Sequence, residues 1–254
     1  MFSLKGKKAL VVGIANDQSI AWGVAQSLKA GGAEVAVTYL NEKAEPHVRP
    51  LAEQIGAPLV RALDVSVPGQ DEALFRDIQQ HWGKLDVLVH SIAFAPRQDL
   101  HGRVVDASAP GFAAAMDISV HSFVRLCRLS EALMTDGGTC MAMSYYGAEK
   151  VVAGYNLMGP VKAALEATVR ELASELGVKN ISVNALSPGP MLTRAAGGIS
   201  EFDALMNHAI QQAPMHRLAT PADVGALAAF LSCDQARNIT GNVIHVDAGA
   251  HIMG

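Results

Sequence analysis

The chain has 254 residues, of which 50% are hydrophobic and 17% are charged, and its formal net charge at pH 7 is -4. This apolar content excludes a disordered chain, and the small excess of acidic residues argues against a nucleic-acid partner, which needs clustered positive charge. No apolar run approaches the roughly 18 residues of a membrane span, so no membrane partner is expected.

Short apolar runs alternate with helical patterns along the whole chain. The runs rarely alternate apolar with polar residues, which is typical of strands buried on both faces. Strands are predicted over residues 9–12, 34–39, 58–65, 85–90, 138–144, 181–186 and 242–246. Helices are predicted over residues 21–30, 70–82, 120–134, 155–176 and 221–232. Thr220 and Pro221 predict the start of the last helix, as its cap and its first residue.

The repeated strand–helix alternation predicts the fold class. Right-handed crossovers would produce a single-domain α/β protein, with a doubly wound, Rossmann-type, mostly seven-stranded parallel sheet and helices on both faces. The segment 188–214 departs from this pattern, because it is rich in proline and glycine and has only a weak helical pattern near residues 202–210. Since it follows the carboxyl end of a strand, we expect it to form a lid over a substrate.

The cysteines and histidines bear on the compartment and on metal binding. The cysteines Cys127, Cys140 and Cys233 form no CxxC pair, and the N-terminal apolar run is too short for a signal peptide. Such sparse cysteines are typical of a reducing compartment, so a cytoplasmic protein is expected. The nine histidines are scattered without a HExxH pair, and no metal site is expected.

The end of the first predicted strand has features of a dinucleotide site. Gly13 would let the backbone approach a pyrophosphate, and a helix starting near Ser19 and Ile20 would point free N–H groups at it. Ser19 could either cap that helix or donate its hydroxyl to a phosphate. The central glycine of GxGxxG is missing, so an ordinary strand–turn–helix remains an alternative.

Two other predicted strands end in residues suited to a cofactor. Asp64 could accept a hydrogen bond from an adenine amino group, or it could simply cap a turn. After the fourth strand, Ser91, Ile92 and Ala93 are small enough to lie beside a ribose. Ligands of such sheets bind outside the carboxyl ends of the strands, where all these residues are predicted to lie.

Tyr155 and Lys162 are the candidate catalytic pair. If Tyr155 opens the predicted helix, Lys162 lies nearly two turns later on the same face. The ammonium would then lower the pKa of the phenol, ordinarily about 10, and could also hold a ribose diol. Beside a nicotinamide, the pair could stabilise an oxyanion formed by hydride delivery. On their own, the two residues would more often be a packed ring and a solvated charge.

A second pair, Tyr146 and Lys150, has the Tyr-x-x-x-Lys spacing of most short-chain dehydrogenases. Tyr146 directly follows a predicted strand, which leaves no room for a helix to begin. The segment 184–189 marks the next predicted strand end. Its distance along the chain from Tyr155 is the usual one for such a strand end, whereas its distance from Tyr146 is too long. The pair Tyr155 and Lys162 is therefore favoured.

The chain resembles the enoyl-[acyl-carrier-protein] reductases of bacterial type II fatty-acid synthesis, a divergent branch of the short-chain dehydrogenase/reductases. The resemblance covers nearly the whole length and rests on five motifs: Gly13-x5-Ser19-Ile20-Ala21, Ser91-Ile92-Ala93-Phe94-Ala95-Pro96, Tyr145-x9-Tyr155-x6-Lys162, Ser187-Pro-Gly-Pro190 and His245-Val-Asp247-Ala-Gly249. It implies hydride transfer from NADH or NADPH to C3 of a trans-2-enoyl thioester held on acyl-carrier protein. It also implies a homotetramer.

The resemblance implies a set of site residues. Tyr155 would hydrogen-bond the enolate, Lys162 would hold the nicotinamide ribose, and Tyr145 would be a second active-site tyrosine. With the strand-end residues above, the expected cofactor contacts are Gly13, Ser19, Ile20, Leu40, Asp64, Val65, Ser91, Ile92, Ala93, Lys162, Met191, Leu192, Thr193, Arg194 and Ala195. Ala95 matches a position beside the substrate, and the apolar acyl cleft is expected to include Phe94, Met158, Ala195, Ala196 and Phe202.

Leu40 bears on the choice of cofactor. Family members that prefer NADH often carry Gln there, whereas NADPH users tend to carry basic residues. Leu40 cannot bond a 2′-phosphate, and Lys43, the only nearby cation in the sequence, is next to Glu42, so NADH is favoured. Two other functions stay open: a short-chain oxidoreductase acting on a carbonyl, and a nucleotide-binding sensor without turnover. The tyrosine spacing argues against the first, and the joint presence of Tyr155 and Lys162 argues against the second.

Overall fold

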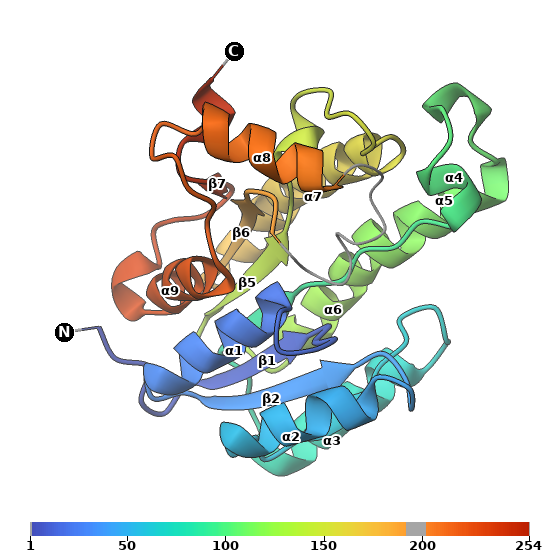
Figure 1. Cartoon of the computed structure of the whole chain (residues 1–254). Coiled ribbons are helices and arrows are strands. Elements are labelled where there is room, and N and C mark those ends of the chain that lie inside the picture. Colours follow the sequence, from blue (N-terminus) through green and yellow to red (C-terminus); the bar gives the residue numbers. More distant parts are fainter. Residues whose placement is uncertain (1, 192–201, 254) are drawn as a thin grey trace.

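Seven parallel strands form one sheet in the computed structural model, which describes residues 2–191 and 202–253 apart from the side chains of 202–205 and 208 (Figure 1). The strands are β1 (Lys8–Val12), β2 (Glu34–Tyr39), β3 (Val60–Ala62), β4 (Val87–His90), β5 (Gly138–Met143), β6 (Ile181–Pro188) and β7 (Val243–Val246). Their order in the sheet is β3-β2-β1-β4-β5-β6-β7. The chain therefore extends the sheet in one direction from β1 to β3 and in the opposite direction from β4 to β7. The predicted doubly wound parallel sheet is thus confirmed. Such sheets bind ligands at the switch point, where the strand order changes direction, and here that point lies between β1 and β4.

Helices cover both faces of the sheet (Figure 1). One face packs against α1 (Ile20–Ala30), α2 (Glu45–Gln54) and α9 (Pro221–Leu231). The other packs against α3 (Gln70–Trp82), α6 (Ser122–Glu131) and α7 (Met158–Gly177). In β1, Leu10 and Val12 contribute to one core while Ala9 and Val11 contribute to the other. This explains why the strands read as continuous apolar runs in the sequence.

Helices α1 and α9 cross closely because glycines meet at the crossing. A Cβ atom on Gly23 would lie 2.4 Å from the carbonyl oxygen of Pro221, and one on Gly225 would lie 2.4 Å from that of Gly23. Helix α9 begins as predicted, with Thr220 as its cap and Pro221 in its first turn. The Thr220 side chain accepts from the Asp223 backbone N–H, and the Asp223 side chain accepts from the Thr220 N–H.

Several elements differ from the sequence-based expectation. The helix predicted over 120–134 is preceded by α5 (Ala109–Met116) and a π-helical turn (Asp117–His121), so that α6 begins only at Ser122. Helices α2 and α4 (Arg97–Leu100) were not predicted; α2 contains Pro50 in its interior, which ordinarily disfavours a helix. The strand predicted over 58–65 shortens to β3. Helix α8 (Phe202–Gln212) matches the weak helical pattern near residues 202–210.

Among the described residues, no helix is both long and apolar enough to cross a membrane.

Candidate active site

Gly13 joins the ends of two neighbouring strands at the switch point. Its φ of 100° lies in the left-handed region, and a Cβ atom would lie 2.4 Å from the carbonyl oxygen of Ser91, just after β4. Its N–H donates to the Thr38 hydroxyl (3.2 Å). Gly13 is therefore needed for the approach of the β4 end, a reason that differs from the predicted room for a pyrophosphate.

The N-terminus of α1 is the candidate anion site. Ser19 is the cap residue by position, but its hydroxyl donates to the Asn16 carbonyl (2.6 Å) and makes no side-chain cap bond to the helix. The first turn contains no acidic residue. Within the described structure, Trp22 and Gly23 donate their backbone N–H groups to the Ser19 carbonyl (3.0 and 3.3 Å), so those of Ile20 and Ala21, at the positive end of the helix dipole, are the ones left for an anion. Of the two roles predicted for Ser19, side-chain capping is wrong, and phosphate binding stays a prediction.

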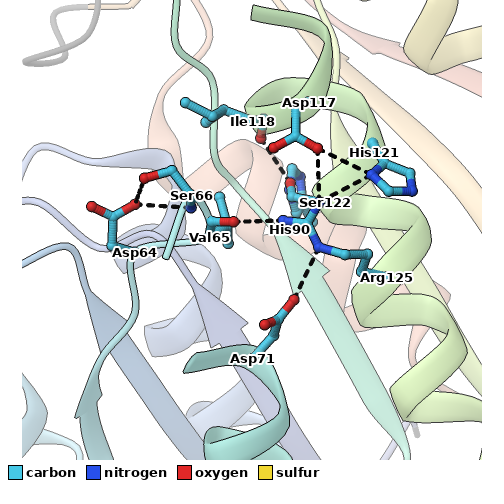
Figure 2. A network of polar contacts seen from close by, with 10 residues as sticks. All are labelled: Asp64, Val65, Ser66, Asp71, His90, Asp117, Ile118, His121, Ser122 and Arg125. Carbon is cyan, nitrogen blue, oxygen red and sulfur yellow. Dashed lines mark hydrogen bonds and ion pairs between the residues drawn. The ribbon is translucent and has the colours of Figure 1, made fainter. Parts of the chain in front are cut away.

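The predicted adenine side of the site is a tight turn after β3. One Asp64 carboxylate oxygen accepts from the backbone N–H (2.9 Å) and the hydroxyl (2.6 Å) of Ser66, while the other points away from this turn (Figure 2). Asp64 is thus a turn residue that still has a free carboxylate oxygen within the described structure. Val65 is buried, and its carbonyl accepts from Arg125. Leu40, after β2, is 53% exposed.

The loop after β4 is anchored from the π-helical turn. The fully buried Ser119 hydroxyl accepts from the Phe94 N–H (2.9 Å) and donates to the Phe94 carbonyl (3.1 Å). This fixes the backbone beside Ser91, Ile92 and Ala93. Sequence reasoning missed Ser119, because nothing in its sequence spacing relates it to Phe94.

Two tyrosines meet beyond the end of β5. The ring centroids of Tyr145 and Tyr155 lie 4.7 Å apart, edge to face at 61°. Gly147 makes this possible, because a Cβ atom there would lie 2.4 Å from the Tyr155 ring and 3.2 Å from the Tyr145 ring. Gly147 was also missed; its conformation gives no signal, and only the contact with the two rings reveals its role.

Tyr155 does not open α7, which corrects the prediction of a shared helical face. The helix begins at Met158, and Asn156 has a left-handed φ of 44°. The Asn156 side chain donates to the Leu100 carbonyl (2.9 Å), which holds the turn in place. Tyr155 therefore approaches the site from a turn that precedes the helix carrying Lys162.

Lys162 is only 4% exposed, although it is a lysine. Its Nζ donates to the Met143 carbonyl at the end of β5 (2.6 Å). Burial lowers the pKa of Lys162 to about 8, while the negative charge of Glu166 acts in the opposite direction. Glu166 lies one turn further along α7 and accepts from the buried Ser144 hydroxyl. The i,i+4 spacing from Lys162 was the sequence signal that could have found Glu166.

The tyrosine pKa values contradict the sequence-based expectation. Burial raises the pKa of Tyr155 well above its usual value, and the nearby Tyr145 and Glu166 add to this rise. Burial also raises the pKa of Tyr145, to about 12. The predicted lowering by Lys162 is therefore wrong, because removal from water dominates and the other groups that shift this pKa also raise it. Near neutral pH both phenols are protonated hydrogen-bond donors.

The alternative pair has a different environment. Tyr146 begins a short 3₁₀ turn (Tyr146–Ala148) and no α-helix. Lys150 is exposed, with its Nζ 5.6 Å from the centroid of the Tyr146 ring. This is a surface cation–π contact.

The residues predicted to line an acyl cleft are only partly described. Phe94 is exposed, whereas Ala95 and Met158 are buried. Met158 is the first residue of α7 and packs in the core between this helix and the sheet. Met191 is buried, on the opposite face of the sheet from Met158. Leu192, Thr193, Arg194, Ala195 and Ala196 lie outside the described residues, as does the side chain of Phe202.

Comparisons with known proteins relate the whole chain to one family. A family model described as "Enoyl-(Acyl carrier protein) reductase" matches residues 13–251. The enoyl-[acyl-carrier-protein] reductase [NADH] FabI of Rickettsia felis is 46% identical, over 99% of this chain and 96% of that protein. The FabI of Nostoc sp. is 47% identical, with both chains covered completely.

Solved structures match equally well. The reductase of Anaplasma phagocytophilum, solved in complex with NAD, has a TM-score of 0.95 at 45% identity, covering 100% of this chain and 97% of that one. The NADH-dependent reductase of Aquifex aeolicus has a TM-score of 0.96 at 47% identity, covering 99% and 98%. The open helix end, the buried lysine and the paired tyrosines thus occur in a sequence that resembles these reductases throughout, and the chain belongs to the enoyl-[acyl-carrier-protein] reductase family.

Proposed function

We propose that this chain reduces the C2=C3 double bond of trans-2-enoyl thioesters on acyl-carrier protein, with NADH as the hydride donor. The observation that carries the proposal is the buried phenol of Tyr155, packed edge to face on Tyr145 just after β5, together with the buried Lys162, whose Nζ donates to the last residue of the same strand. The family relationship supports the same reaction.

The described residues fit a nicotinamide dinucleotide. The N-terminus of α1 has neither a side-chain cap nor an acidic residue, which suits a pyrophosphate. The Lys162 ammonium has three donors, and in the described structure its hydrogen-bond acceptor is the Met143 carbonyl, so donors remain for a ribose diol. When bound, NADH supplies the hydride for C3. The remaining cofactor contacts would come from the predicted residues after β1, β2, β3, β4 and β6.

Tyr155 stabilises the charge that develops on the thioester oxygen. A neutral phenol donates a hydrogen bond to the enolate oxygen, and a fixed donor strengthens this interaction as negative charge builds up. Because the pKa of Tyr155 is raised, it keeps its proton near neutral pH and functions as a donor rather than as a base. Tyr145 orients the ring by edge-to-face packing. Lys162 orients the ribose and adds a positive charge.

The acyl chain would lie against Phe94, Ala95, Met158, Ala195, Ala196 and Phe202, with residues 188–214 as a lid. Phe94 and Ala95 follow β4, at the same edge of the sheet as Tyr145. An apolar wall at this edge would suit a hydrocarbon chain. We also expect a homotetramer in the cytoplasm, as the family resemblance implies.

Leu40 supports NADH over NADPH. Its half-exposed apolar side chain follows β2, where a 2′-phosphate would need a cation. No arginine or lysine occupies that position.

The test is a coupled comparison of substrates. Purified protein is mixed with a crotonyl thioester and NADH, and the loss of NADH absorbance is followed. Rapid oxidation with the enoyl substrate, and none with a ketone, is the expected result. Reduction of the ketone alone would assign the chain to a carbonyl reductase, and tight NADH binding without any turnover would assign it to a nucleotide sensor.

A further inference from the structure

Arg125 ties three separate segments together at the carboxyl edge of the sheet (Figure 2). It belongs to α6, and its Nη2 donates to the Val65 carbonyl (2.5 Å) in the loop after β3. Its Nε donates to Asp71 in the first turn of α3 (3.0 Å), and its Nη1 donates to Asp117 in the π-helical turn (2.9 Å). One planar guanidinium thus joins the loop after β3, the first turn of α3 and the π-helical turn.

Burial makes the contacts of Arg125 with Val65 and Asp71 stronger than ordinary surface ion pairs, whereas the Asp117 side chain is 46% exposed. The side chain of Arg125 is 21% exposed, and that of Asp71 is 6% exposed. Charge-assisted hydrogen bonds in such surroundings are less screened by water and salt than exposed pairs. The π-helical turn matters as well, because it presents Asp117 to the same guanidinium.

The loop held by Arg125 is the one assigned above to the adenine of the cofactor. Val65 follows Asp64 directly, and the Asp64 oxygen that faces away from Ser66 is available to an amino group (Figure 2). Asp64 is also held from the start of α3, since its N–H donates to the Gln70 side chain (2.7 Å). Arg125 holds the Val65–Ser66 peptide group by its carbonyl, and the N–H of the same peptide group donates to the Asp64 carboxylate (2.9 Å).

We propose that Arg125 is a positioning residue for the adenine half of the dinucleotide. It acts through the Val65 carbonyl, which fixes the backbone that presents Asp64 and Val65 to the base. The inference rests on the proposed function, because that function assigns the loop to adenine. It predicts that Arg125 affects the affinity for the adenosine end of NADH and leaves hydride transfer unchanged.

The experiment separates the two halves of the cofactor in the intact enzyme. Arg125→Met removes every donor and keeps an apolar stem, Arg125→Lys keeps the charge, and Arg128→Met is the control on an exposed arginine of the same helix. Binding of 5′-AMP reports the adenosine half, and turnover of the enoyl thioester with reduced nicotinamide mononucleotide reports the other half. KM and kcat are measured with NADH.

For Arg125→Met we expect about a tenfold rise in the KM for NADH and in the dissociation constant of 5′-AMP, the scale of a lost hydrogen bond to a charged group. The kcat and the rate with reduced nicotinamide mononucleotide should stay within about twofold, which is less than 1 kcal/mol. Arg125→Lys should recover part of the loss, because a single ammonium replaces the planar fork. Arg128→Met should change none of these values.

An unchanged 5′-AMP affinity in Arg125→Met overturns the proposal, and so does an equal loss with both half-cofactors, which would indicate a general structural role. If Arg125→Met does not fold, Asp71→Asn decides the question, because it weakens the guanidinium contact at nearly constant volume. In that variant, unchanged 5′-AMP binding likewise overturns the proposal. If the wild-type enzyme binds 5′-AMP but reduces no enoyl thioester, the proposed function fails while the binding comparison still tests Arg125.

Discussion

The proposed role of Tyr155 requires its phenol to stay protonated, which the burial of the side chain favours. Tyr155→Phe removes the donor and keeps the ring that packs on Tyr145. We expect turnover to fall by roughly 10²–10³, the effect of losing one oxyanion donor. NADH affinity, measured by fluorescence titration, should stay within about twofold, because the hydroxyl is assigned to the substrate. An unchanged rate would contradict the role of Tyr155.

The proposed ribose contact of Lys162 should make cofactor binding depend on pH. Its pKa of about 8 means that the ammonium is complete well below pH 8 and is lost as the pH rises through that value. We therefore expect kcat/KM for NADH, which reports the free enzyme, to decline above about pH 8. Lys162→Ala should lower both the affinity and the turnover and abolish this decline. Retention of wild-type affinity in Lys162→Ala would show that Lys162 does not hold the ribose.

Glu166 provides a second check on the same titration. Its negative charge raises the pKa of Lys162, so Glu166→Gln should move the decline of kcat/KM toward lower pH. A purely structural role for Glu166 would lower the activity equally at all pH values. In that case the position of the decline would not move.

The residue types of the site could be predicted from the sequence, but their geometry could not. Tyr155 and Lys162 were identified by their seven-residue spacing, which suggested a helix throughout. In the structure, Tyr155 lies in a turn before the helix, because Asn156 adopts a left-handed conformation that no periodicity indicates. The raised pKa of Tyr155 could not be predicted either, since it arises from burial by segments far apart in the chain.

At the scale of elements, the crossing of α1 and α9 links stability to the cofactor site. A methyl group on Gly225 would lie 2.2 Å from the Ser27 hydroxyl and 2.4 Å from the Gly23 carbonyl oxygen, so the helices would have to separate. For Gly225→Ala we expect a loss of about 1–3 kcal/mol from overpacking, measured by urea unfolding. Because α1 carries the proposed pyrophosphate site, NADH affinity should fall as well.

A matched variant on an open glycine distinguishes this clash from the effect of the substitution itself. Gly177 is the last residue of α7, and a methyl group added to it would meet no atom within 4 Å in the described part of the chain. Its φ is not left-handed, so alanine fits its backbone. Gly177→Ala should therefore leave the stability nearly unchanged. Equal losses in the two variants would contradict the argument from the α1–α9 crossing.

The buried strands were the elements that the sequence indicated most clearly, because a strand covered on both faces must be continuously apolar. The π-helical turn and α5 escaped prediction for a physical reason. Ser108 caps α5, but the helix itself is almost entirely apolar and small, so it has no polar face to mark its period. The π-helical turn inserts an extra residue between α5 and α6, which disrupts any single helical period across them.

At the scale of the whole molecule, cofactor binding at the switch point should stabilise the entire fold. The proposed contacts come from both halves of the sheet, and an unfolded chain cannot assemble them. NADH at about 100 times its dissociation constant should stabilise the protein by about 2.7 kcal/mol. For a protein of this size, that corresponds to a rise in Tm of roughly 5–11 °C, measured by differential scanning calorimetry.

The same measurement tests the choice of cofactor. At equal concentration, NADPH should raise the Tm less than NADH, because Leu40 offers its 2′-phosphate neither a charge nor a hydrogen bond. Leu40→Arg supplies a guanidinium at that position and should increase the shift with NADPH more than the shift with NADH. Lys162→Ala should reduce the shift with both, because the ribose contact is common to the two cofactors. A wild-type protein stabilised more by NADPH than by NADH would reverse the proposed preference, and Leu40 would then have to be removed from the adenosine site.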